Sequence, residues 1–134
     1  MIDFDYINDL IGVPFLDNGR TLNGLDCYGL VLEVSETQFN NHLPDWRTNH
    51  TAANVAKQIS SGIESVVMKG KAFKFDKPLD GDIAVVARKE TPYHMGIVLA
   101  GGILHTTRET GVLFQPIAAF THGQGKTEFY RWVT

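Results

Sequence analysis

The sequence predicts an α+β fold in which helices come first and an antiparallel sheet follows. In the first half of the 134-residue chain, apolar residues recur at helical spacing. After Pro78, short β-rich segments alternate with turn residues. Helices followed by a meander of strands, without βαβ units, is the order of an α+β fold. We expect a single domain over residues 1–134, which is long enough to bury a core without disulfides or metals.

Three helices are predicted in the first half. Asp3 can cap a short helix that ends before Pro14. A polar connection then leads to Asp26, the natural N-cap of a second helix. Residues 38–50 have the composition of a loop, and a third helix is predicted over residues 52–66.

Five strands are predicted in the second half, at residues 83–87, 94–100, 103–107, 111–115 and 128–133. Gly101-Gly102 lies between the second and third of them, where a two-residue hairpin turn is expected. The densest basic stretch, residues 69–77, is interpreted as a solvated loop.

Composition excludes several classes of function. The net charge of -3 and the absence of a long basic run argue against nucleic-acid binding. A single cysteine excludes an internal disulfide and the usual structural zinc sites. The N-terminus carries three aspartates and no basic residue, unlike a secretory signal, and no apolar run approaches the length of a membrane span. We therefore expect synthesis in the cytoplasm without a signal peptide, and no membrane insertion.

The single cysteine, Cys27, has two interpretations. If Asp26 caps the second helix, Cys27 is its first residue, where unpaired amides and the helix dipole favour a thiolate and lower a thiol pKa to roughly 3.5–7.5. However, Cys27, Leu30, Val31 and Val34 would share one apolar face of that helix, as core residues do. The local sequence leaves both interpretations open.

A thiol nucleophile needs a base, and the base needs an orienting group. His94 and His105 belong to predicted strands, whereas the other three histidines, His42, His50 and His122, lie in polar, loop-like stretches. His94 and His105 are therefore the candidates.

The hairpin register decides whether these two histidines can meet. With a turn at Gly101-Gly102, His105 pairs with Val98 and shares a face with His94, but the two are then about 13 Å apart. Contact requires a different turn, or a bulge with strong twist. The sequence does not settle this register.

Four segments together resemble a known family: GVPF, GLDCYGLV, DGDIAVV and HMGIVLAGGILHTT. In order and spacing they resemble the NlpC-type cysteine peptidases, papain-like hydrolases of bacterial cell walls, from Gly12 to the final EFYRW. The resemblance implies a papain-like fold, with N-terminal helices packed on a C-terminal antiparallel sheet of about five strands.

The resemblance also implies a role for each candidate. Cys27 would be the nucleophile, His94 the general base and His105 the residue that orients His94. The backbone amide of Cys27 would donate to the oxyanion. Asp26 would lie beside it, and neither a cofactor nor a metal would be needed.

The sequence departs from the family pattern at two of the expected oxyanion or substrate-binding positions. Many members have tyrosine where this chain has Phe15, and serine where it has Tyr28. Phe15 cannot supply a hydroxyl. The aromatic residue directly after the cysteine resembles the branch found in phage tails and prophages.

We therefore hypothesise a cysteine endopeptidase or amidase that hydrolyses peptidoglycan stem peptides through a thiol acyl-enzyme. The family's usual target is the bond between D-glutamate and diaminopimelate. A thiolate and imidazolium pair is expected at neutral pH. Phage tail proteins are the expected partners, with the protein carried in the virion or delivered to the wall by another machine.

Three alternatives use the same residues. One is a papain-like amidase or acyltransferase acting on another acyl substrate. A second is a structural phage-tail component with a degenerate site, which Phe15 motivates. The third is a mononuclear zinc site formed by Cys27, His94 and His105.

Overall fold

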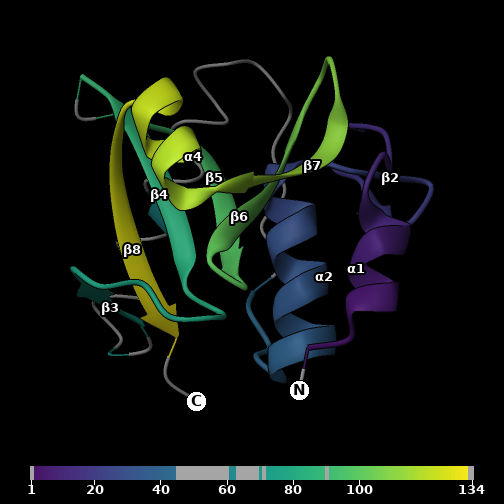
Figure 1. Ribbon diagram of the computed structural model, residues 1–134, viewed down its shortest axis with the longest axis horizontal. Coiled ribbons are helices and arrows are strands. Elements are labelled where there is room, and N and C mark those ends of the chain that lie inside the picture. Colours follow the sequence, from purple (N-terminus) through teal and green to yellow (C-terminus); the bar gives the residue numbers. More distant parts are fainter. Residues whose placement is uncertain (1, 45–60, 63–69, 71, 90, 133–134) are drawn as a thin grey trace.

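The computed structural model describes residues 2–44, 61–62, 70, 72–89 and 91–132 (Figure 1). The helices are α1 (Phe4–Leu10), α2 (Cys27–Phe39) and α4 (Ile117–Gln124). The strands are β1 (Arg20–Thr21), β2 (Gly24–Leu25), β3 (Ala72–Phe75), β4 (Ile83–Arg88), β5 (Thr91–Leu99), β6 (Gly102–Thr107), β7 (Gly111–Pro116) and β8 (Lys126–Trp132). In the described residues, α1 and α2 precede the main sheet, so the predicted α+β class is confirmed.

The first two predicted helices form where their caps place them. The Asp3 carboxylate accepts a hydrogen bond from the Tyr6 amide at 3.2 Å at the start of α1. The Asp26 carboxylate accepts one from the Gly29 amide at 2.7 Å at the start of α2. The third predicted helix, residues 52–66, falls almost wholly outside the described residues.

The main sheet has six antiparallel strands in the order β3-β8-β4-β5-β6-β7, one more than predicted. The additional strand is β3, which lies at the edge, pairs with β8 and falls within the basic stretch interpreted as a loop. That interpretation was wrong about pairing. Three of the four β3 residues are exposed, and Lys74 forms an ion pair with Glu128 at 3.1 Å, so a short, charged edge strand looks like a loop in sequence.

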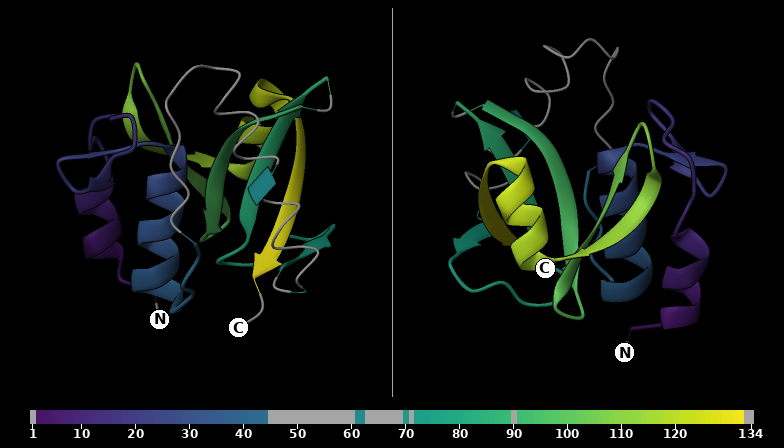
Figure 2. Two further views of the ribbon diagram at one scale, coloured as in Figure 1. Left: turned by 180° about the vertical axis from the view of Figure 1, so that it is seen from behind. Right: turned by 45° about the horizontal axis from the view of Figure 1, so that its top comes forward.

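Helices cover both faces of the sheet (Figure 1). On one face, Leu30 and Val31 of α2 pack in the same buried cluster as Ile97 and Leu104, and α1 lies beside α2 (Figure 2). On the other face, α4 places Phe120 against a second cluster. The sequence did not predict α4, which follows β7 directly and is only eight residues long.

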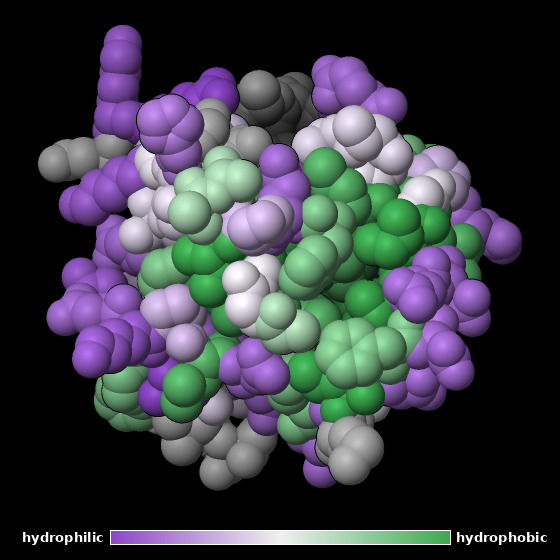
Figure 3. Space-filling model, viewed as in Figure 1, coloured by the Kyte–Doolittle hydropathy of each residue, from purple (hydrophilic) through white to green (hydrophobic). Residues whose placement is uncertain are grey.

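The surface is mostly polar at its edge and apolar toward the middle of the face seen in Figure 3. In the part of the chain that the structure describes, no helix combines the length and apolar character needed to cross a membrane.

The β5–β6 hairpin turns one residue earlier than predicted. Leu99 pairs with Gly102, so the two turn residues are Ala100 and Gly101, with φ of 50° and 78°. Two consecutive positive φ values are those of a type I′ turn. Gly102 belongs to the strand because it pairs with Leu99 and Pro116, and it must be glycine because any side chain there would collide with the ring of Phe114 on β7.

The two strands of this hairpin part soon after the turn. In the described chain their ladder runs only from Leu99 to Ile97 on β5, and from Gly102 to Leu104 on β6. Beyond that point, in the described residues, β5 stays paired with β4 alone and β6 with β7 alone. A bulge between Val86 and Ala87 interrupts the β4–β5 pairing next to His94. Bulges change the direction in which nearby side chains point, and this bulge lies next to the candidate base, His94.

Gly96 keeps the parting strands close enough for their side chains to meet. A Cβ on Gly96 would lie 2.8 Å from the Leu104 carbonyl oxygen and 3.1 Å from the His105 Cβ. Gly96→Ala should therefore push β6 away and lower the free energy of unfolding by about 1–3 kcal/mol, measured by chemical denaturation. Ala100→Gly, in the same hairpin, is the control and should not destabilise, because it relieves a left-handed alanine. Equal losses in the two variants would contradict this account.

Candidate active site

His94 and His105 are in direct contact. The Nε2 of His94 lies 3.0 Å from the Nδ1 of His105, and the rings meet edge to face with centroids 5.2 Å apart. Continued from the observed pairing, the register sets His105 opposite Gly96, so His94 reaches it diagonally across the parted strands. The two histidines therefore share a face as predicted. The register, which the sequence left open, follows from the turn at Ala100-Gly101, and it brings the two rings into contact.

Two residues that the sequence did not single out complete this cluster. Gln115 on β7 places its side-chain oxygen 2.6 Å from the Nε2 of His105. Phe120, fully buried on α4, packs edge-on against His105 with ring centroids 4.8 Å apart, and lies 6.1 Å from His94. Gln115 lies two residues after Leu113 on a predicted strand and so shares its face, and this was the one sequence signal for it. Phe120 gave none, because α4 was not recognised.

Cys27 is the first residue of α2, and 9% of its surface is exposed. It packs in the same cluster as Leu30 and Val31, so it is a core residue as well as a helix N-terminal one. Its sulfur accepts a hydrogen bond from the backbone of Met95, the residue after His94. The thiol therefore lies at the part of β5 that has separated from β6. Among the described residues, the ring of His94 hydrogen-bonds to His105 and not to this sulfur.

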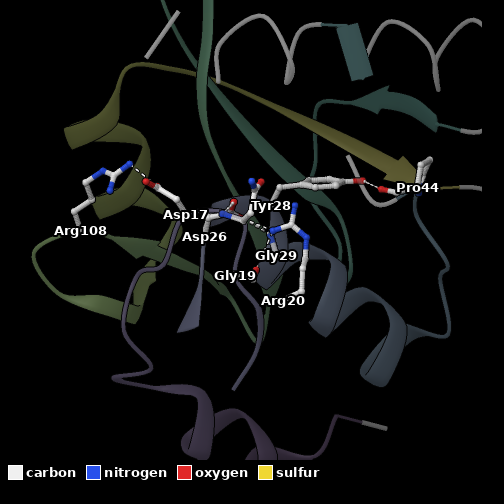
Figure 4. A network of polar contacts seen from close by, with 9 residues as sticks. Asp17, Gly19, Arg20, Asp26, Tyr28, Gly29, Pro44 and Arg108 are labelled. Carbon is white, nitrogen blue, oxygen red and sulfur yellow. Dashed lines mark hydrogen bonds and ion pairs between the residues drawn. The ribbon is translucent and has the colours of Figure 1, made fainter. Parts of the chain in front are cut away.

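Asp26 fixes the start of α2 (Figure 4). Only 7% exposed, its carboxylate accepts hydrogen bonds from the amides of Gly29 at 2.7 Å and Asn18 at 3.0 Å. It also pairs with the Arg20 guanidinium at 2.8 Å. A side chain at Gly29 would collide with the carbonyl of Gly19, so the loop can close on the helix only at a glycine. Together, these contacts position Cys27.

The two positions that depart from the family pattern have contacts of their own. Tyr28 is 7% exposed, and its hydroxyl donates to the Pro44 carbonyl at 2.5 Å. The Arg108 guanidinium carbon lies 4.5 Å from the centre of the half-buried Phe15 ring, and Arg108 pairs with Asp17 at 2.6 Å (Figure 4). Tyr28 thus has little surface to offer a substrate. A substrate contact for either residue stays a prediction.

Sequence comparison now decides the family. A sequence model of the NlpC/P60 family matches residues 12–125, which span nearly all the elements described above. The chain belongs to the NlpC/P60 family. The family predicted from the sequence motifs is thereby confirmed.

Structural comparison gives the same NlpC/P60 fold. The crystal structure of the NlpC/p60 domain of the peptidoglycan hydrolase SagA matches with a TM-score of 0.61 and 19% sequence identity. The match covers 97% of this chain and 95% of that domain. No curated protein matches the sequence.

The electrostatics of this NlpC/P60 site run against one expectation. Burial, reinforced by the negative charge of Asp26, raises the pKa of Cys27 to about 12, despite its helix N-terminal position. Burial and the neighbouring His105 lower the pKa of His94 to about 4. Burial also lowers the pKa of His105. Both shifts favour a neutral thiol and a neutral imidazole at pH 7 over the expected thiolate–imidazolium pair.

The remaining candidates are dispersed. His42 and His122 are exposed, and His50 lies outside the described residues. Within the described ranges, no three histidine, cysteine, aspartate or glutamate side chains gather closely enough to hold a metal ion.

The raised thiol pKa predicts how Cys27 responds to an alkylating agent. Because Cys27 is the only cysteine, iodoacetamide modification followed by mass spectrometry reports on it alone. The folded protein should react slowly, with a rate that rises about tenfold per pH unit through pH 9 and has no plateau near neutrality. The urea-unfolded chain, with an ordinary thiol pKa of about 8.5, is the control. A plateau from pH 5 to 8 in the folded protein would show that a thiolate is present.

Asp26→Asn should separate stability from thiol reactivity. The substitution removes the charge with which the largely buried Arg20 pairs, so we expect a loss of about 2–4 kcal/mol in the free energy of unfolding. It also removes a charge that raises the Cys27 pKa, so iodoacetamide should react faster at a fixed pH of 8. Denaturation and alkylation would be measured below the unfolding temperature. Slower alkylation of a folded variant would contradict the second expectation.

Proposed function

We propose that this protein is a cysteine peptidase that hydrolyses the peptide stems of peptidoglycan. The proposal depends on the position of the Cys27 thiol at the start of α2. The thiol hydrogen-bonds to the backbone of Met95, the residue after His94. His94 in turn hydrogen-bonds to His105. Membership of the NlpC/P60 family and structural similarity to a domain of a peptidoglycan hydrolase support the substrate class.

In the first step, His94 takes the proton of the Cys27 thiol as the sulfur attacks the substrate carbonyl carbon. The direction of both pKa shifts favours neutral groups at the start, so in this proposal proton transfer accompanies attack. The carbonyl oxygen becomes an oxyanion, to which the Cys27 backbone amide at the start of α2 can donate.

In the second step, the carbon–nitrogen bond breaks and the His94 imidazolium gives its proton to the leaving amine. A thioester then links Cys27 to the acyl part of the substrate. Water attacks this thioester, and His94 accepts a proton from the water. The carbon–sulfur bond then breaks, the sulfur recovers its proton from His94, and the carboxylic acid product leaves. His105 shares a hydrogen bond with His94 and orients its ring.

The finer parts of the proposal concern the bond and the setting. We propose the D-glutamyl-diaminopimelate bond as the target, as in the family. The aromatic Tyr28 supports the phage-tail branch, with delivery to the wall in a virion or by a secretion apparatus.

The direct test is incubation of the purified protein with peptidoglycan, with released peptides identified by mass spectrometry. We expect new amino termini at one type of peptide bond and no cleavage by Cys27→Ala. His94→Ala should lower the rate by roughly 10²–10⁴-fold, the usual contribution of a general base. His122→Ala, which removes an exposed histidine, is the matched control. Cleavage that survives Cys27→Ala would refute the proposal.

A binding function is the second candidate, motivated by Phe15 where the family pattern has a hydroxyl. In that case the wild-type protein and Cys27→Ala would sediment equally with peptidoglycan, and neither would release peptides. Cleavage by the wild type eliminates this candidate.

A further inference from the structure

A chain of three polar side chains extends from the site into the sheet. The Nε2 of His94 lies 3.0 Å from the Nδ1 of His105, and the Nε2 of His105 lies 2.6 Å from the Oε1 of Gln115. These side chains come from β5, β6 and β7. Gln115 is the end of this chain, and neither the proposed mechanism nor the sequence motifs assign it a role.

The chemistry of Gln115 fixes the direction of every hydrogen bond in this chain. An amide oxygen can only accept, so the Nε2 of His105 must carry a proton. In a neutral imidazole the other nitrogen is then bare, so the Nδ1 of His105 accepts. It follows that the Nε2 of His94 carries a proton and donates it, which leaves the Nδ1 of His94 with a lone pair.

We propose that Gln115 is a positioning residue that holds both histidines in the Nε2–H tautomer and so makes the Nδ1 of His94 the basic atom. The proposal rests on the proposed function for its consequence in catalysis. Its claim about the two tautomers rests on geometry alone.

The position of Cys27 agrees with this assignment. Nδ1 is the ring nitrogen nearer to the main chain. The Cys27 sulfur hydrogen-bonds to the backbone of Met95, the residue after His94. With the opposite tautomers, the Nδ1 of His94 would carry a proton and could not accept the one on the thiol. A base held in the wrong tautomer loses most of its catalytic effect.

The surroundings of Gln115 hold its oxygen in place. Gln115 pairs with Ile103 in the β6–β7 ladder, and Gly102 has no side chain to keep β7 away. Phe120 packs against the ring of His105, which is only 1% exposed. Few competing partners can therefore turn the His105 ring, although Gln115 itself is partly exposed.

The test compares Gln115→Met, which has a similar length without the amide, with Gln115→Glu, which still accepts. Leu113→Met is the matched control, because Leu113 is on the same strand and pairs with His105 in the ladder. Nitrogen-15 NMR of the histidine rings at pH 8, where both are neutral, reads the tautomers directly. We expect pure Nε2–H tautomers in wild type, Gln115→Glu and Leu113→Met, and a mixture in Gln115→Met.

Cleavage of peptidoglycan fragments provides the second readout. Gln115→Met should lower kcat by about 10- to 100-fold with little change in KM, as loss of a supporting hydrogen bond does. Gln115→Glu should keep kcat within about threefold of wild type. Unchanged tautomers in Gln115→Met, or the same loss of kcat in Gln115→Glu as in Gln115→Met, would overturn the proposal.

Failure of the proposed function would look different. If the wild-type protein releases no peptide, the peptidase proposal fails, and the NMR spectra still decide whether Gln115 sets the tautomers. If the wild type cleaves and the spectra of wild type and Gln115→Met agree, Gln115 has no such role.

Discussion

The parting of β5 and β6 beyond Ile97 and Leu104 is the constraint from which the site follows. While two strands are paired, their facing backbone groups are used by the ladder. Where they separate, the backbone of Met95 can hydrogen-bond to the Cys27 sulfur. The His94 ring can also hydrogen-bond diagonally to His105 on β6. The bulge in the β4–β5 pairing next to His94 and the missing side chain of Gly96 both act at this same place.

The start of α2 lies on the other side of the site from β5. It is held in place by more contacts than an ordinary N-cap makes. A capping carboxylate normally satisfies one or two helix amides. Asp26 also binds the Asn18 amide and the Arg20 guanidinium, which ties the preceding loop to the helix. Thus Cys27 is fixed from the helix side and from β5. The same arrangement carries an electrostatic cost, because the Asp26 charge disfavours ionisation of the neighbouring thiol.

Sequence reasoning predicted those parts of the fold that are set locally. Asp3 and Asp26 are caps, and their effect is confined to one helical turn, so α1 and α2 were recognisable. The family motifs pointed to Cys27, His94 and His105 as one set of candidate residues.

The features that sequence reasoning missed depend on distant neighbours. Gly102 was assigned to the turn because the Phe114 ring that requires a glycine there comes from β7. Thiol ionisation depends on distant neighbours in the same way. A helix N-terminus is a local property and lowers a thiol pKa, whereas the burial of Cys27 depends on the packing of β5 against α2 and has the larger effect. Gln115 was missed because its role appears only when β6 and β7 are in register, beyond any motif that contains a catalytic group.

Burial and neutrality together give a consistent picture of how such a site can be stable and still react. A neutral thiol beside Leu30 and Val31 packs as an apolar side chain, so storing the nucleophile in this form does not weaken the core. His105 and Gln115 are neutral acceptors, so they orient His94 without fixing a positive charge on it. In the proposed mechanism, the imidazolium formed during attack is stabilised by the developing oxyanion and by these dipoles. The ionic state then exists only while a substrate carbonyl is present to share its charge.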